Sequence, residues 1–294
     1  MDFLAACHFL SALLMMALPV GLAIILTNHW KLGWRLWFVS AATFILSQTL
    51  HIPFLQISTS ILNRPPLVDY FLEASTIWLV IFNGVFVGLA AGLFEELFRY
   101  GMFRWWAKDA RSWRTGILTG AGHGGMEAII AGALALYGFF QLVAYRTVDL
   151  STLVPASQLE LAKAQVSSYW SLPWYDAFLP VIERLSAIVI QISMAVLVLQ
   201  TFVRKQWFWV WVAVLYHAVI DFFTVPMAAG YISKYAAEAI VGGFAVLSLA
   251  IIFLLRRPEP AARDHEVAPA PVVQPLNVKP IEETGENLDS TRFQ

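Results

Sequence analysis

Ionisable side chains inside long apolar stretches are the feature of this sequence most suited to chemistry. Four motifs carry them: GLFEELFRY, GHGGME, IER and YHAVIDF. An ionised side chain at the centre of a membrane-spanning helix costs about 2.5–3.5 kcal/mol on insertion scales. We therefore expect these groups to face one another or a water-filled cavity. The residues are Glu95, Glu96, Arg99, His123, Glu127, Glu183, Arg184, His217 and Asp221.

The first motif predicts a general base. Arg99 follows Glu95 by four residues and Glu96 by three, so its guanidinium can reach either carboxylate along a helix. Two adjacent carboxylates in a low-dielectric site cannot both ionise at low cost, so one tends to hold its proton. A carboxylate beside a carboxylic acid is the arrangement that activates water and then protonates a leaving amine.

Two His–carboxylate pairs predict the groups that would assist this base. His123 and Glu127, and likewise His217 and Asp221, are four residues apart. In this hypothesis His123 orients the water, while Asp221 fixes the tautomer of His217, which donates to a developing oxyanion. Glycines on both sides of His123 permit the close approach of another helix. Glu127 is expected to support the site or to be only a helix-packing partner.

Glu183 and Arg184 are expected to orient helices rather than to take part in chemistry. They lie toward the other end of their helix, on the side where Gln48 and His51 are also expected. The sequence has no GxSxG motif, and no Ser or Cys nucleophile has an obvious neighbouring base. A non-covalent hydrolysis is therefore the chemistry that the polar residues favour.

The same side chains offer an alternative as metal ligands. Imidazole and carboxylate groups suit Zn²⁺, and the candidate ligands are Glu95, Glu96, His123 and His217. The sequence has no HExxH motif, and its single cysteine, Cys7, excludes a cysteine-based zinc site. We therefore expect no cofactor, with Zn²⁺ as the alternative.

Composition and hydropathy identify the elements that would position these groups. Hydrophobic residues make up 59% of the chain and charged residues 13%, against about 25% charged residues in an average soluble domain. We predict an all-α membrane bundle of about seven transmembrane helices in residues 1–257, with a catalytic core at about 74–228 and a disordered cytoplasmic tail at 258–294. The predicted spans are 3–27, 34–57, 74–98, 115–144, 178–203, 206–228 and 236–255.

Loop charges predict the orientation of this bundle. Ten Lys and Arg residues fall in loops on one side and four on the other, so the positive-inside rule places the N-terminus outside and the C-terminus in the cytoplasm. The ten are Lys31, Arg35, Arg104, Lys108, Arg111, Arg114, Arg204, Lys205, Arg256 and Arg257; the four are Arg64, Arg146, Lys163 and Lys234. Glu95 and Glu96 would then lie near the cytoplasmic end of the third span. The outer loop at 145–177 is expected to hold an amphipathic stretch, Ser157–Tyr169.

The order of the four motifs, between about residues 80 and 225, resembles the YhfC-type intramembrane proteases, which are described as glutamic-type and earlier as putative metalloproteases. Gly-His-Gly-Gly-x-Glu is the most specific piece. More distantly, the pattern is similar to the CAAX-processing and bacteriocin-processing (CPBP/Abi) membrane proteases. Those carry Glu-Glu-x-x-x-Arg, a His on the next core helix, and a His-x-x-x-Asn/Asp pair.

The resemblance implies roles for individual residues. Glu95 or Glu96 would activate water with His123, while His217 and Asp221 would stabilise the oxyanion. This sequence departs from the CPBP pattern because only two residues separate the second glutamate from the following arginine. The motif therefore leaves the base open between the two glutamates, and we favour Glu95.

We expect an intramembrane endopeptidase that cleaves a membrane-associated peptide or protein near the cytoplasmic face of a bacterial plasma membrane. No basic, aromatic-interleaved patch suggests a nucleic-acid partner. The alternatives are a zinc-dependent intramembrane protease, a proton-coupled transporter that uses the acids as a relay, and a non-catalytic scaffold or immunity protein. A protease requires the acids and imidazoles to converge, a relay requires them to cross the whole membrane, and a scaffold requires closed pairs.

Overall fold

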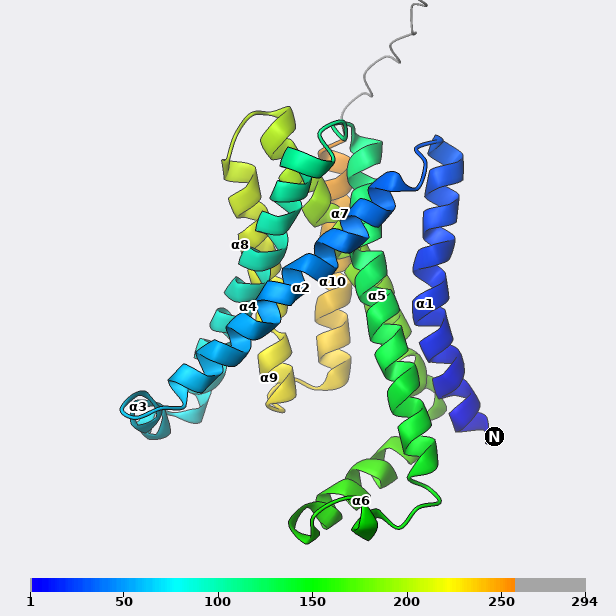
Figure 1. Cartoon of the computed structure of the whole chain (residues 1–294), viewed down its shortest axis with the longest axis vertical. Coiled ribbons are helices and arrows are strands. Elements are labelled where there is room, and N and C mark those ends of the chain that lie inside the picture. The colour runs from blue at the N-terminus through cyan, green and yellow to red at the C-terminus, as the bar shows by residue number, and fades with distance from the viewer. Residues whose placement is uncertain (1, 257–294) are drawn as a thin grey trace, which may run out of the picture. The chain divides into compact units, whose positions relative to one another are not determined.

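The computed structural model describes residues 2–256, apart from the side chains of residues 70–72, and every regular element in this part of the chain is helical. Seven helices are long and apolar enough to cross a membrane, which confirms the predicted multi-pass membrane bundle (Figure 1). They are built on α1 (Phe3–Trp30), α2 (Arg35–Leu62), α4 (Thr76–Gly101), α5 (Trp113–Ala144), α7 (Leu179–Val203), α8 (Phe208–Phe222) and α10 (Lys234–Leu254). Three of these spans include adjoining short helices, so that they cover Thr76–Trp106, Trp174–Val203 and Phe208–Ala228. The predicted tail, 258–294, lies outside the described residues.

Short helices connect these spans. They are α3 (Leu67–Glu73), the 3-10 helices η2 (Leu150–Thr152) and η3 (Trp174–Phe178), α6 (Ala156–Trp170) and α9 (Thr224–Ala228). Helix α6 confirms the helical stretch predicted in the loop at 145–177, and none of its residues is buried. Helix α9 continues from α8 after a single residue, Phe223, and leads into the loop before α10.

The third span is longer than predicted. The sequence analysis ended it at residue 98, but α4 runs to Gly101 and continues as a π-helix, η1 (Met102–Trp106). Glu95 therefore lies eleven residues before the end of the span, which is about 16 Å of helix, and not near its end. The depth was misjudged because the span was ended at residue 98, whereas the helix continues to Trp106 and Arg99 is 0% exposed inside the bundle.

Successive long helices run in opposite directions, so alternate loops lie at opposite ends of the bundle (Figure 1). We call the end that carries the loops after α1, α4, α7 and α10 the basic end, because the described members of the predicted basic set lie there. The other is the opposite end, which carries α3, α6 and α9. The basic end is at the top of Figure 1.

Glycines allow the core helices to pack in close contact. A Cβ on Gly88 of α4 would lie 2.3 Å from the carbonyl oxygen of Ala218 on α8. Likewise, a Cβ on Gly120 of α5 would lie 2.4 Å from the Cα of Ile192 on α7. Small residues at helix interfaces bring backbones together in membranes, where lipid is as apolar as the side chains. These contacts hold α4 against α8 and α5 against α7.

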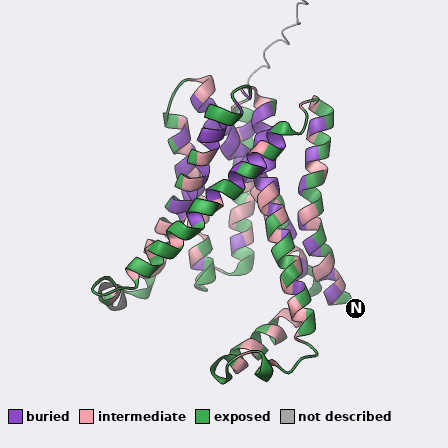
Figure 2. Ribbon diagram, in the orientation of Figure 1, coloured by how far each residue is buried: buried purple, intermediate pink, exposed green. Residues whose placement is uncertain are grey.

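The basic half of the bundle is filled with apolar side chains. Met102, Phe103, Leu118, Val198 and Val210 are each 0% exposed and belong to one cluster contributed by α4–η1, α5, α7 and α8. Buried positions gather in this half in Figure 2, and intermediate and exposed positions dominate the other half. The polar motifs lie between the two.

Candidate active site

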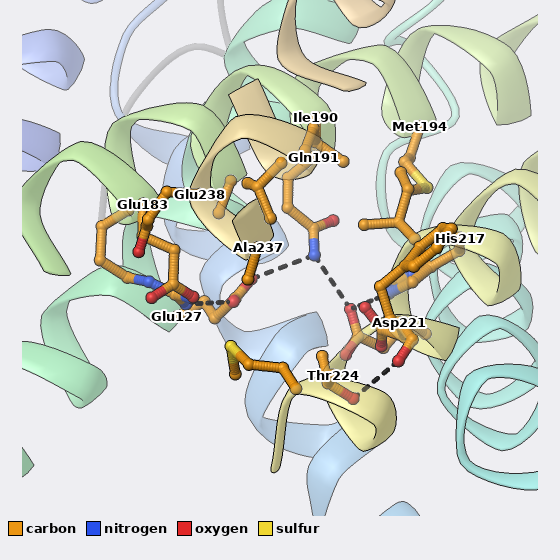
Figure 3. Close-up of a pocket in the computed structure, with 17 residues that line it drawn as sticks. Glu127, Glu183, Ile190, Gln191, Met194, His217, Asp221, Thr224, Ala237 and Glu238 are labelled. Carbon is orange, nitrogen blue, oxygen red and sulfur yellow. Dashed lines mark hydrogen bonds and ion pairs between the residues drawn. The ribbon is translucent and has the colours of Figure 1, made fainter. Parts of the chain in front are cut away.

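Glu95 occupies the inner end of a cavity. Its carboxylate comes from α4, and its side chain is 8% exposed. The cavity has a volume of about 160 Å³, which is room for several water molecules. It lies among α4, α5, α7, α8, α9 and α10 (Figure 3). Glu95 is thus the member of the Glu–Glu motif that faces open space, whereas Glu96 is 0% exposed and does not line the cavity.

Four side chains from four helices surround the Glu95 carboxylate. The amide nitrogen of Gln48 donates to its Oε1 at 2.8 Å, and that of Gln191 donates to its Oε2 at 3.2 Å. The Nε2 atoms of His123 and His217 lie 3.0 and 3.9 Å from Oε2. The two amide hydrogen bonds stabilise the negative charge of the carboxylate, because hydrogen bonds to an ionised group are strong in a low-dielectric site.

His217 lies between carboxylates on both ring nitrogens. Its Nδ1 is 2.8 Å from Oε1 of Glu96, and its Nε2 is 3.5 Å from Oδ2 of Asp221. The i,i+4 spacing predicted that Asp221 orients this ring. In the structure Glu96 has the closer contact and leaves Nε2 directed toward Glu95 and Asp221. The helical i,i+4 spacing revealed Asp221 but could not reveal the contact between α4 and α8.

Arg99 binds Gln191 and also pairs with one of the two glutamates. Its Nη1 donates to the backbone carbonyl of Gln191 at 2.9 Å, and its Nη2 donates to Oε1 of the Gln191 side chain at 2.5 Å. Its Nε lies 3.6 Å from Oε2 of Glu96. Since Oε1 of Gln191 accepts from Arg99, its amide nitrogen must point toward the carboxylates. Of the two carboxylates that Arg99 was expected to reach, it therefore pairs with Glu96 and contacts Glu95 only through Gln191.

Glu127 belongs to a second cluster nearer the opposite end. Its Oε1 accepts from Arg184 at 2.6 Å, and Arg184 also pairs with Glu183. Its Oε2 accepts from the amide nitrogen of Gln191 at 3.1 Å (Figure 3). The spacing suggested a contact with His123, whose closest acidic partner is instead Glu95. Gln191 therefore joins the two polar clusters that the sequence analysis treated as separate.

Two amides of the site escaped the sequence analysis as functional residues. Gln48 and Gln191 are uncharged, so they carry little of the insertion cost that marked the other residues. Gln48 was expected beside Glu183, but it contacts Glu95, and His51 lies 3.3 Å from it rather than in the outer cluster. The available signal for Gln191 was its position on the same helical face as Glu183 and Ala187.

The donor set around Glu95 has the chemistry of a zinc site. Two imidazole nitrogens and a carboxylate oxygen are a common ligand set of catalytic Zn²⁺, and a carboxylate on the far nitrogen, as Glu96 on His217, typically orients such a ligand. Among the residues that the structure describes, no three acidic, histidine or cysteine groups are arranged as a preformed metal site. The residue types therefore fit a zinc ion. In the structure, two of the candidate ligands, Glu95 and His123, contact each other directly.

Comparisons with known proteins identify a family for this chain. The sequence model of the family described as YhfC intramembrane metalloprotease matches residues 14–242, which include every polar residue around Glu95. An uncharacterized membrane protein YhfC from Bacillus subtilis (strain 168) is 28% identical over 256 residues, covering 84% of this chain and 95% of that protein. No solved structure matches the chain at a significant level.

Proposed function

Because this chain belongs to the YhfC intramembrane metalloprotease family, which supports a proteolytic function in the membrane, we propose that it hydrolyses a peptide bond of a membrane-associated substrate with a water activated by Glu95. The observation that carries this proposal is the position of Glu95 at the inner end of a cavity, with two imidazole nitrogens 3.0 and 3.9 Å from one carboxylate oxygen. The Bacillus relative fits a bacterial plasma membrane as the location.

Each step of this hydrolysis has a residue in place. Glu95 removes a proton from a water in the cavity, and the oxygen attacks the substrate carbonyl. His217, as an imidazolium that donates from Nδ1 to Glu96, directs Nε2 toward the cavity and donates from it to the oxyanion. His123 contacts Glu95 and limits the rotation of its carboxylate. Glu95 then gives this proton to the amide nitrogen as the C–N bond breaks, which yields a carboxylic acid and an amine and restores the Glu95 carboxylate.

Arg99 and Gln191 act as positioning residues in this proposal. Arg99 fixes the Gln191 amide at both its backbone and side-chain oxygens, and the Gln191 nitrogen then donates to Glu95 and Glu127. All of these atoms are buried or half-buried, so the amide cannot rotate without leaving a polar group unpaired. The arrangement fixes the orientation of the Glu95 carboxylate before substrate binds.

The geometry favours a hydrolase over a proton relay or a closed scaffold. A relay would continue through the membrane, but the polar chain ends at Arg99, beyond which Met102, Phe103 and Leu118 fill the described helices with 0% exposure. A scaffold would bury its acids in closed pairs, whereas Glu95, Glu127 and Asp221 line a common cavity. Convergence on a cavity is what hydrolysis requires.

A zinc-dependent form of the same hydrolysis is the second candidate, and the donor set together with the family's description favours it. Glu95, His123 and His217 would hold the ion, which would polarise water and the scissile carbonyl. Glu96 would in that case keep its contact with Nδ1 of His217 and orient the ligand. Arg99 and Gln191 keep the same positioning contacts in both forms.

The test compares wild-type protein with Glu95→Gln, Glu96→Gln and His123→Ala, each purified in detergent and incubated with membrane peptides. Loss of cleavage in Glu95→Gln supports the proposal, and undiminished cleavage in all three variants would remove it. Each incubation is repeated with a chelator, and the zinc content of each purified protein is measured. Bound zinc in wild type that is lost in His123→Ala, together with activity lost to chelator and restored by zinc, would establish the metal form.

A further inference from the structure

The cavity that ends at Glu95 communicates with the opposite end of the bundle. Its outer lining comes from the first turns of α7 and α10 and from α9, where Glu183, Glu238 and Met227 lie (Figure 3 labels the two glutamates). Side-chain exposure falls from 40% at Glu183 through 23% at Glu127 to 8% at Glu95. This gradient indicates a continuous route from that end to the Glu95 carboxylate.

Toward the basic end the same site is sealed. His123 and Arg99, which lie behind Glu95 and Gln191, are 0% exposed. Beyond them the apolar cluster of the basic half begins, and its members Phe103 and Leu118 are also 0% exposed. A close-packed layer of this kind admits neither water nor a peptide.

The route lies between the α8–α9 corner and α10. At the level of His217, α8 and α10 are joined, because the hydroxyl of Tyr216 donates to the carbonyl of Phe244 at 3.1 Å and lies 2.9 Å from Oγ of Ser248. Toward the opposite end, Asp221 and Thr224 on one side and Glu238 and Val241 on the other line the cavity instead. The passage is thus closed on the side of the site that faces the basic end and open on the side that faces the opposite end.

The side chains along this passage require water. Five carboxylates line the cavity, accompanied by Arg184 and His217; the five are Glu95, Glu127, Glu183, Asp221 and Glu238. Ionisable groups within a membrane protein face the bundle interior or hydrated cavities because lipid cannot solvate them. The passage is therefore an aqueous inlet that reaches the site from the opposite end.

We propose that the site takes its substrate from the membrane face opposite the basic loops, which the positive-inside rule makes the extracytoplasmic face. The inference that the incoming molecule is a substrate rests on the proposed function, whereas the route itself does not. The substrate class is a peptide segment that crosses the outer half of the bilayer or emerges from it. This replaces the expectation of cleavage near the cytoplasmic face.

Cysteine labelling in cells tests the route. Cys7 is the only cysteine and is buried, so Cys7→Ala provides a background without thiols. Into it are placed Glu238→Cys or, as a second site at the mouth of the cavity, Met227→Cys. Lys163→Cys on α6 and Lys108→Cys in the loop after η1 are exposed references for the opposite and basic ends. A membrane-impermeant maleimide is applied to intact cells and to inverted vesicles.

We expect Glu238→Cys and Met227→Cys to be labelled in intact cells together with Lys163→Cys, and to lose labelling in inverted vesicles, where Lys108→Cys reacts. If both mouth positions are labelled in inverted vesicles, as Lys108→Cys is, the route is overturned. It is also overturned if neither mouth position is labelled in either preparation. Reaction of Lys108→Cys in intact cells would overturn the assignment to the extracytoplasmic face. Because labelling needs no turnover, expected labelling without any peptide cleavage would remove the proposed function alone.

Discussion

The two halves of this bundle are built from the same helices but differ in what fills them. Toward the basic end, α4–η1, α5, α7 and α8 enclose apolar side chains with almost no exposure, such as Phe103 and Val198. Toward the opposite end, the same helices diverge around a cavity lined by carboxylates. The contrast is visible in Figure 2, where burial is concentrated in the upper half of the bundle.

This difference explains how the chain carries ionisable groups within the membrane. At the edge of the packed half, Arg99 donates to the backbone and side-chain oxygens of Gln191 on α7. Gln191 in turn donates to Glu95 and orients it at the border of the hollow half. The hollow half gives the carboxylates that line it a cavity large enough for several water molecules. Rigid support on one side and solvent on the other are what a preorganised hydrolytic site requires.

The largest expected effect lies at the border between the halves. Glu95→Gln keeps the shape of the side chain but removes the base, so we expect the rate of peptide cleavage to fall by about 10²–10⁴-fold, the range for general acid–base catalysis. Initial rates with detergent-purified protein measure this. Asp109→Asn, an exposed carboxylate at the basic end paired with Arg35, is the control and should cleave like wild type. An equal loss in both variants would contradict a special role for Glu95.

The next largest effect is expected at the carboxylate that orients His217. Glu96→Gln removes the negative charge 2.8 Å from Nδ1 that stabilises the doubly protonated ring, so we expect a loss of about 10–100-fold in kcat, the range for carboxylates that orient histidine ligands. Asp221→Asn should cost less, because Asp221 is 3.5 Å from Nε2 and 31% exposed. A greater loss in Asp221→Asn would restore the assignment made from helical spacing.

Truncating an apolar side chain should lower the free energy of unfolding more in the packed half than in the half that holds the cavity. Leu199→Ala removes a side chain that is 1% exposed in the packed half, and we expect it to lower the free energy of unfolding by about 2 kcal/mol, near the low end for buried leucines because lipid is itself apolar. Met227→Ala at the mouth of the cavity, where the side chain is 41% exposed, should have little effect. Thermal unfolding in one detergent compares them. Similar losses in both variants would mean that the two halves are equally packed.

The smallest effect concerns the amide that links the polar clusters. Gln191→Glu keeps an acceptor for Arg99 but loses the NH₂ group that donates to Glu95 and Glu127, so we expect kcat to fall about tenfold, the value of roughly one hydrogen bond, with KM nearly unchanged. The unfolding temperature should fall as well, because a third carboxylate is buried beside two others.

Gln200→Glu is the matched control for that substitution. Gln200 is a buried amide on the same helix, and its Oε1 accepts from Arg204 at 3.0 Å as that of Gln191 accepts from Arg99. It lies in the packed half, away from the cavity. If its replacement lowers kcat as much as Gln191→Glu does, the effect of Gln191→Glu is a general consequence of a buried charge and not of positioning.

Hydropathy and charge alone determined the membrane bundle, its seven spans and the set of ionisable residues that converge. These features are readable from the sequence because the cost of burying a charge in lipid is large and local. Family membership confirmed the resemblance seen in the motifs. The residue types and their helical spacing also identified the motifs that meet at Glu95, although the roles of these residues remain predictions.

Only the tertiary structure decided which contacts those residues make. The i,i+4 rule pairs His217 with Asp221 and His123 with Glu127, but the closer partners, Glu96 and Glu95, come from another helix. Gln191 was overlooked because an uncharged amide has a small insertion cost, and the depth of Glu95 was misjudged because a π-helix extends its span. Contacts between helices depend on their rotation and on the close approach that Gly88 and Gly120 permit, and hydropathy encodes neither.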